Sequence, residues 1–69
     1  MNYYYYLTPY EEIIRIKVKR KPLARKNGDR LYGPIEEFND RMWYQRTVSE
    51  ITANTLRQYT YIGKSLADE

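Results

Sequence analysis

The chain contains no cysteine and no histidine. It therefore cannot form a disulfide or a thiolate metal site, and it lacks the ligands of a zinc finger and the histidine base of a nucleophilic triad. No stretch approaches the roughly 20 apolar residues of a membrane span, and the N-terminal segment 1–7 has neither a charged leader nor an aliphatic run. These absences predict a cytoplasmic protein without a metal or cofactor.

Catalytic chemistry is not evident in the carboxylates either. The pairs Glu11-Glu12 and Glu36-Glu37, with Asp40, are the candidates for acid–base work or ion binding. Adjacent glutamates at a helix start are ordinarily dipole partners or solvated surface, and no nucleophile–base set accompanies them. We expect a protein that is not an enzyme.

The 69 residues suffice for a single small domain over residues 1–69. A chain this short buries only about 60% of the surface that it exposes when unfolded, so it is marginally stable alone. A homodimer or another partner would add stability. Residues 64–69 form a short polar tail of the kind that is often disordered.

Charge is strongly segregated along the chain. Residues 15–30 carry eight of the twelve basic side chains and one acid, a net charge of +7, whereas the other residues carry four cations and eight acids, a net −4. A cationic ribbon of this kind indicates that the protein binds something anionic.

Nine tyrosines stand beside one tryptophan and one phenylalanine. Tyrosines 3–6 are adjacent, and strand spacing would place Tyr4 and Tyr6 on one face and Tyr3 and Tyr5 on the other. Two interpretations remain open: half of these rings pack in a core, or they form an interaction surface for a protein or for unstacked bases. The candidate aromatic surface comprises Tyr3, Tyr5, Tyr10 and Trp43.

The next segment alternates apolar and basic residues. Ile14, Ile16 and Val18 would lie on one face of a strand over residues 13–20, with cations on the other. Residues 8–12 precede it as a turn or a single helical turn, and Pro22 ends the strand or confines it to an edge. Asn27-Gly28 indicates a tight hairpin, although a flexible basic loop fits residues 25–30 as well.

Helical patterns occupy the rest of the chain. Ile35, Phe38 and Met42 form one apolar stripe of a helix that begins at Pro34 and ends near residue 44. Residues 47–50 form a capping box, which predicts a second helix as far as a stop at Gly63. The alternative for residues 43–62 is a hairpin around Ala53-Asn54, because both flanks are rich in β-forming residues. The predicted fold class is α+β: an N-terminal basic strand or hairpin followed by two short amphipathic helices.

This order resembles the ribbon-helix-helix DNA-binding proteins over residues 13–59. The second-helix start at residues 46–51 and the continuation at 56–59 are similar to that family's Ser/Thr-rich helix start and apolar continuation. The resemblance implies an intertwined dimer whose paired strands enter the major groove. It also implies that Arg15, Lys17 and Lys19 point at base edges and that amides near Thr47 and Ser49 clamp a phosphate.

The predicted function is a small nucleic-acid-binding regulator that uses the cationic ribbon, with duplex DNA as the favoured partner. The main alternative is a small inhibitor, of the sort that a virus or mobile element uses, that blocks a host protein or nucleoprotein complex. Binding to single strands or RNA is a further alternative, because interleaved tyrosines and cations suit base stacking. The candidate contact residues are Arg15, Lys17, Lys19, Arg20, Lys21, Arg25, Lys26, Arg30, Arg46, Thr47 and Ser49.

Overall fold

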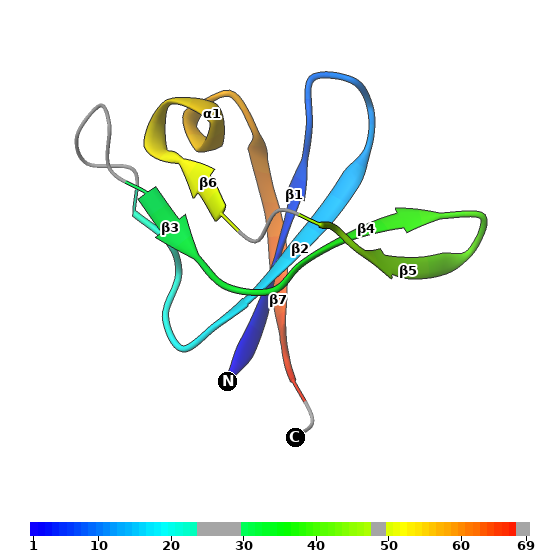
Figure 1. Cartoon of the computed structure of the whole chain (residues 1–69), viewed down its shortest axis with the longest axis horizontal. Coiled ribbons are helices and arrows are strands. Elements are labelled where there is room, and N and C mark those ends of the chain that lie inside the picture. Colours follow the sequence, from blue (N-terminus) through cyan, green and yellow to red (C-terminus); the bar gives the residue numbers. More distant parts are fainter. Residues whose placement is uncertain (24–29, 48–49, 68–69) are drawn as a thin grey trace.

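The computed structural model describes residues 1–23, 30–47 and 50–67, and its elements in chain order are shown in Figure 1. They are β1 (Asn2–Leu7), β2 (Ile13–Val18), β3 (Arg30–Tyr32), β4 (Ile35–Asn39), β5 (Met42–Gln45), β6 (Glu50–Thr52), α1 (Ala53–Arg57) and β7 (Thr60–Leu66). Five strands form an antiparallel sheet in the order β5-β4-β2-β1-β7, while β3 and β6 form a second, two-stranded sheet.

The central hairpin β1–β2 confirms the two predicted N-terminal strands. Its register places Tyr4 opposite Ile16 and Tyr6 opposite Ile14. Both isoleucines are fully buried, and the two tyrosines are 4% and 3% exposed. Because side chains alternate along a strand, Tyr3, Tyr5 and the cations of β2 lie on the opposite face. The alternation in the sequence therefore describes this hairpin correctly.

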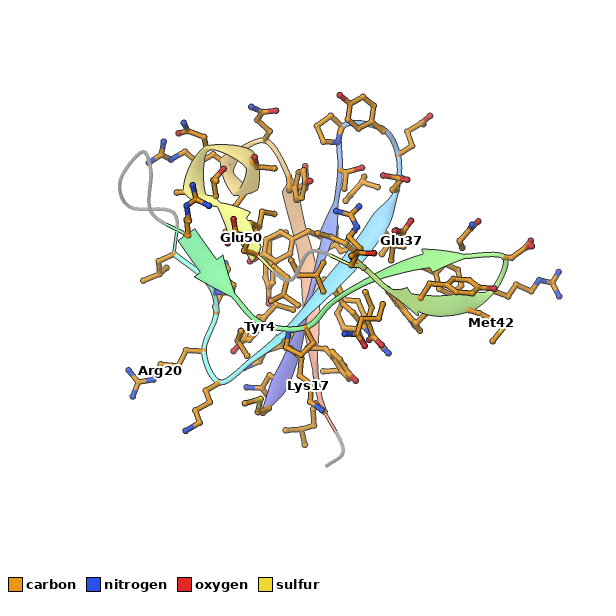
Figure 2. All side chains as sticks on the ribbon, viewed as in Figure 1. Tyr4, Lys17, Arg20, Glu37, Met42 and Glu50 are labelled. Carbon is orange, nitrogen blue, oxygen red and sulfur yellow. The ribbon has the colours of Figure 1, made fainter. Side chains whose placement is uncertain are left out.

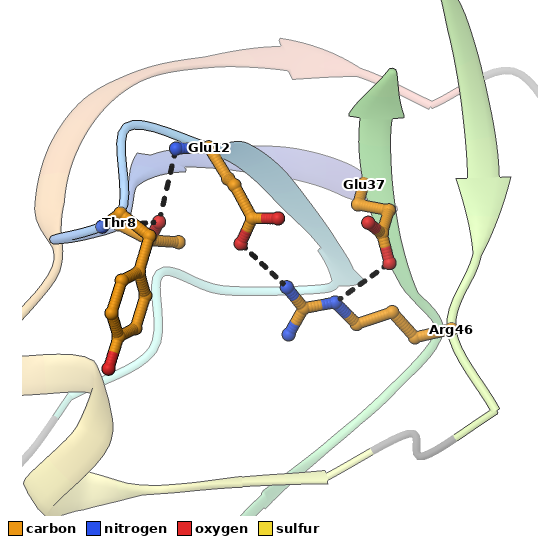
Figure 3. Close-up of polar contacts among 5 residues, drawn as sticks. Thr8, Glu12, Glu37 and Arg46 are labelled. Atoms are coloured by element: carbon orange, nitrogen blue, oxygen red, sulfur yellow. Dashed lines mark hydrogen bonds and ion pairs between the residues drawn. The ribbon is translucent and has the colours of Figure 1, made fainter.

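A hydrogen-bonded turn connects β1 to β2, as expected for residues 8–12. The hydroxyl oxygen of Thr8 accepts hydrogen bonds from the backbone N–H groups of Tyr10 and Glu12, each at 3.2 Å (Figure 3). The Thr8 N–H in turn donates to the Glu12 carbonyl at 2.8 Å. Thr8 is buried, so these bonds satisfy a hydroxyl that would otherwise be unpaired.

The chain between residues 30 and 52 contributes strands to both sheets, and Figure 1 shows it leave β3 of the second sheet for β4 of the first. Gly33 marks the crossing over β2, where the Lys17 N–H donates to the Pro34 carbonyl at 3.1 Å. A Cβ at Gly33 would lie 2.9 Å from a Val18 methyl and 3.0 Å from the Lys17 carbonyl oxygen. The close approach of the two backbones therefore requires glycine here.

The second sheet and the short helix close the core. Ile51 of β6 and Leu56 of α1 are 7% and 5% exposed and join the cluster that contains Ile14, Ile16 and Ile35. Thr52 caps α1, because its hydroxyl accepts the Thr55 N–H at 3.3 Å. The last strand, β7, then returns to pair with β1.

The predicted pair of amphipathic helices is wrong. Residues 35–45 form the β4–β5 hairpin, in which Phe38 and Met42 are 42% and 59% exposed rather than part of a buried stripe. Residues 47–62 contain β6, α1 and part of β7, and the one helix in the described chain has five residues. The fold is mostly β instead of α+β. The resemblance to ribbon-helix-helix proteins is wrong as well, because that fold needs two substantial helices.

Smaller expectations for the C-terminal part also change. The alternative hairpin around Ala53-Asn54 is not formed, because these residues begin α1 and β7 pairs with β1. Gly63 is not a helix stop but lies inside β7, with a φ of 147°, next to a bulge opposite Tyr5 and Tyr6. Residues 64–66, in the expected tail, belong to β7.

The predicted turn at Asn27-Gly28 lies outside the described residues. No helix in the described ranges is long and apolar enough to cross a membrane.

Replacing Gly33 by alanine should lower the free energy of unfolding by about 1–3 kcal/mol, since the new methyl must displace backbone or the Val18 side chain. The φ of Gly33 is not in the left-handed region, so the effect is steric. Urea unfolding measures it, with Tyr10→Ala at an 84% exposed position as the control. Equal stability of Gly33→Ala and the parent would show that the crossing is looser than described.

The β4–β5 turn predicts a stabilising substitution. Asn39 pairs with Met42, and the two residues between them, Asp40 and Arg41, have φ values of 54° and 66°. This is the backbone of a type I′ turn, which favours glycine at the second position. Arg41→Gly should raise stability by about 1 kcal/mol. Met42→Gly, at the adjacent strand position, should lower it, and a loss in both variants would contradict the assigned turn.

Tyr6 predicts a dependence of stability on alkaline pH. Its hydroxyl has no hydrogen-bond partner in the part of the chain that the structure describes. Burial, together with the neighbouring phenols of Tyr61 and Tyr4, raises the pKa of Tyr6 to about 12. The unfolded chain therefore loses this proton near pH 10 while the folded chain keeps it, and stability should fall as pH rises from 10 towards 12.

Tyr6→Phe should raise stability at neutral pH, because an unpaired buried hydroxyl costs about 1–3 kcal/mol. It should also reduce the alkaline loss. Urea unfolding at neutral and alkaline pH tests both effects, with the exposed Tyr10→Phe as the matched control. A variant that is less stable at neutral pH would indicate a hydrogen bond to the Tyr6 hydroxyl.

Candidate functional site

One face of the five-stranded sheet carries a cluster of aromatic rings around an arginine. We call it the outer face and define it by Tyr3, Tyr5, Arg15, Glu36, Phe38 and Trp43. These residues come from β1, β2, β4 and β5. They lie on this face because the alternate residues Tyr4, Tyr6, Ile14, Ile16 and Ile35 fill the core on the other side.

Arg15 is the centre of the outer face. Its guanidinium carbon lies 3.9 Å from the centroid of the Tyr3 ring and 4.1 Å from that of the Trp43 ring. Its Nε donates to the Oε1 atom of Glu36 at 2.6 Å, so a charge-assisted hydrogen bond joins adjacent strands. Two cation–π contacts and an ion pair thus fix one side chain on the sheet.

The other rings form a continuous aromatic surface beside Arg15. The Trp43 ring lies 5.7 Å from the Tyr5 ring and 5.1 Å from the Phe38 ring, between centroids, with tilted planes in both pairs. The Tyr5 hydroxyl is hydrogen-bonded to the Ser65 hydroxyl of β7 at 2.8 Å. Tyr3, Tyr5 and Trp43 are half-buried and Phe38 is 42% exposed, so each ring keeps part of its surface accessible.

Arg15 remains charged in this setting. Burial lowers its pKa, but the hydrogen bonds to Glu36 and Tyr5 and the charge of Glu36 outweigh that effect and raise the pKa above its ordinary value. The side chains of Arg15 and Glu36 are 16% and 25% exposed. The outer face therefore presents a partly shielded, nearly neutral ion pair framed by rings.

The end of the sheet beside the outer face is cationic. We define this cationic end as Lys17, Lys19, Arg20 and Lys21, and Figure 2 shows Lys17 and Arg20 at the side of the molecule where both termini lie. Strand alternation places Lys17 on the outer face, opposite Tyr3 in the register. Lys19, Arg20 and Lys21 are exposed. The Nζ of Lys21 lies 3.9 Å from the centroid of the Tyr61 ring, which packs against Tyr4 and Tyr6, so this lysine reaches towards the core side of the sheet and not towards the outer face.

Two other predicted contact residues form ion pairs elsewhere in the structure. Arg30 forms an ion pair with Glu50 across the second sheet. The Arg46 guanidinium lies 3.4 Å from the Glu37 carboxylate and 3.8 Å from the Glu12 carboxylate (Figure 3). It therefore connects β4 to the β1–β2 turn. These two arginines are thus engaged in contacts between structural elements.

The phosphate clamp expected at a second helix start is not formed. Thr47 lies exposed at a bend before β6, and the described chain has its helix at Ala53–Arg57 instead. Tyr10 lies in the β1–β2 turn, away from the rings of the outer face. Arg25, Lys26 and Ser49 lie outside the described residues.

The sequence patterns did not indicate Glu36 and Phe38 as parts of the site, nor Ser65 as the partner of the Tyr5 hydroxyl. The first two were assigned to a helix, where they would not have faced Arg15. A strand assignment of residues 35–39 would have placed Glu36 and Phe38 on one face by alternation, so the signal was present.

The chain matches no protein-family model, and the comparisons found no similar curated protein and no similar solved structure. Within the described ranges, no three His, Cys, Asp or Glu side chains are grouped as a metal site would need.

Proposed function

We propose that this protein binds single-stranded nucleic acid, with bases on the aromatic rings of the outer face and phosphates along the cationic end. The observation that carries the proposal is the continuous group of accessible rings around Arg15, directly beside exposed cations. Aromatic platforms next to a positive track are the common design of proteins that bind single strands without strong sequence preference.

The rings suit bases because every base has a flat surface that can stack. Tyr3 and Tyr5 lie on β1 and Trp43 lies on β5, with neighbouring rings in contact. Neighbouring bases of one nucleic-acid strand can therefore each stack on a different ring. Each such stack contributes about 1–3 kcal/mol in other proteins. The binding energy would therefore come mainly from Tyr3, Tyr5, Phe38 and Trp43.

The cationic end suits the phosphate backbone. Lys19 and Arg20 are exposed and follow directly on β2, whose outward cations are Arg15 and Lys17. A nucleic-acid strand whose bases stack on the rings can thus place its next phosphates beside these cations. Affinity should fall with salt, with a slope of about 0.7 for each phosphate neutralised.

Single strands are favoured over duplex DNA for a geometrical reason. Bases in a duplex are stacked on one another and cannot meet the rings. The helix of the described chain has five residues, which is too short for the helix-based mode of reading the major groove.

A protein partner is the second candidate function, in keeping with a small inhibitor. The β4–β5 hairpin extends from the rest of the sheet in Figure 1 and exposes Phe38, Met42 and Tyr44 by 42%, 59% and 47%. Exposed apolar groups on a projecting hairpin are typical of protein contacts.

Trp43 provides a direct test, because it is the only tryptophan in the sequence. Adding oligo(dT) or oligo(U) of about 12 nucleotides should quench its fluorescence, and a duplex of equal length should do so less. Tyr3→Leu should weaken binding by roughly tenfold, within the range of one lost stack. Tyr10→Leu, at an exposed tyrosine outside the cluster, should leave the affinity unchanged.

The charge contribution has its own control. Lys19→Ser with Arg20→Ser should reduce the salt slope by about 1.4, whereas Arg57→Ser on α1 should not change it. The proposal is wrong if neither oligonucleotide binds at about 50 mM salt, or if Tyr10→Leu weakens binding as much as Tyr3→Leu. The next experiment is then a pull-down for a protein partner, with the β4–β5 hairpin variant Met42→Ser as the control.

A further inference from the structure

We infer that Glu36 limits the affinity of the outer face for nucleic acid, and that a backbone phosphate replaces its carboxylate on Arg15 when a strand binds. This inference rests on the proposed function and specifies how the same site is regulated.

The first argument concerns the freedom of Arg15. Tyr3 and Trp43 contact the guanidinium at 3.9 and 4.1 Å from their centroids, so the group is restrained on the sheet. A ligand anion must then approach the guanidinium where it stands. There the Nε–H is already donated to Glu36 at 2.6 Å. A phosphate can gain this donor only by displacing the carboxylate.

The second argument concerns charge. The negative charge of Glu36 neutralises Arg15 in the middle of the surface that a polyanion would occupy. A phosphate arriving at about 4 Å from that carboxylate meets a repulsion equivalent to roughly fivefold in affinity, even in water. Glu36 is 25% exposed, so it can turn into solvent without opening the core.

The third argument is that the fold does not depend on this ion pair. Arg15 and Glu36 are direct cross-strand neighbours in a register that continues from Ile13–Phe38 to Ile16–Ile35. The backbone ladder and the buried isoleucines hold β2 and β4 together there. Substituting Glu36 should therefore leave the structure intact.

The neighbouring residue provides a matched control. Glu37 lies on the same strand, points to the other face and pairs with Arg46 at 3.4 Å. Glu36→Gln and Glu37→Gln make the same change of charge one residue apart, and glutamine at position 36 keeps an oxygen that can accept from Arg15. Any effect of net charge alone would appear in both variants.

Titration of oligo(dT) monitored by Trp43 fluorescence distinguishes the outcomes. Glu36→Gln should bind three- to tenfold more tightly than the parent, whereas Glu37→Gln should change affinity less than twofold. If the parent binds but Glu36→Gln binds equally or more weakly, the inference is wrong while the proposed function stands. If neither the parent protein nor Glu36→Gln binds a nucleic-acid strand, both the inference and the proposed function are wrong.

A second measurement needs no substitution. The Arg15 Nε–H resonance of the parent protein should shift on adding oligo(dT) and show coupling to phosphorus, because its acceptor changes from carboxylate to phosphate. An unchanged resonance in the saturated complex would mean that Glu36 keeps its place, and it would overturn the inference even if Glu36→Gln failed to fold.

Discussion

The alternation of side chains in β1 and β2 is the constraint on which the rest of the structure depends. These strands are central in the sheet, and their register fixes which tyrosines are buried and which meet Arg15. A shift of one residue would place Arg15 among the core isoleucines and expose Ile14 and Ile16. The cost of burying an unpaired charge forbids that shift, so the core and the outer face are specified by the same pattern.

The size of the chain explains the remaining architecture. One face of the central sheet must be covered, and few residues are available to cover it. β6 and α1 provide this cover, because Ile51 and Leu56 pack in the core cluster with Tyr4 and Tyr6. The outer face is left without such a cover from β6 and α1. Its aromatic residues pack against one another and against the guanidinium of Arg15 instead.

Local patterns predicted the local parts of this fold and failed where pairing is distant. The strands around Tyr4 and Ile16 follow from a period of two, but Ile35, Phe38 and Met42 match helical spacing only because a turn separates the third from the others. That turn uses Asp40 and Arg41 at positive φ and carries no glycine, so it gives no hairpin signal. The β1–β7 pairing joins the two ends of the chain and leaves no local trace. Tyr3, Tyr5, Arg15 and Trp43 were identified individually, whereas their grouping required the sheet order.

Two arginines that both pair with glutamates differ in their surroundings, and the difference supports the proposed binding role of only one of them. Arg46 contacts Glu12 of the β1–β2 turn and Glu37 of β4, and the excess of acid over base makes this cluster unattractive to an anion. Arg15 forms an ion pair with one glutamate and lies over the neutral rings of Tyr3 and Trp43. Removal of one carboxylate would leave a charged guanidinium already oriented on the surface. In the proposed complex, a phosphate of the bound nucleic-acid strand would supply the replacement, and the rings that orient Arg15 would also be the rings on which the bases stack.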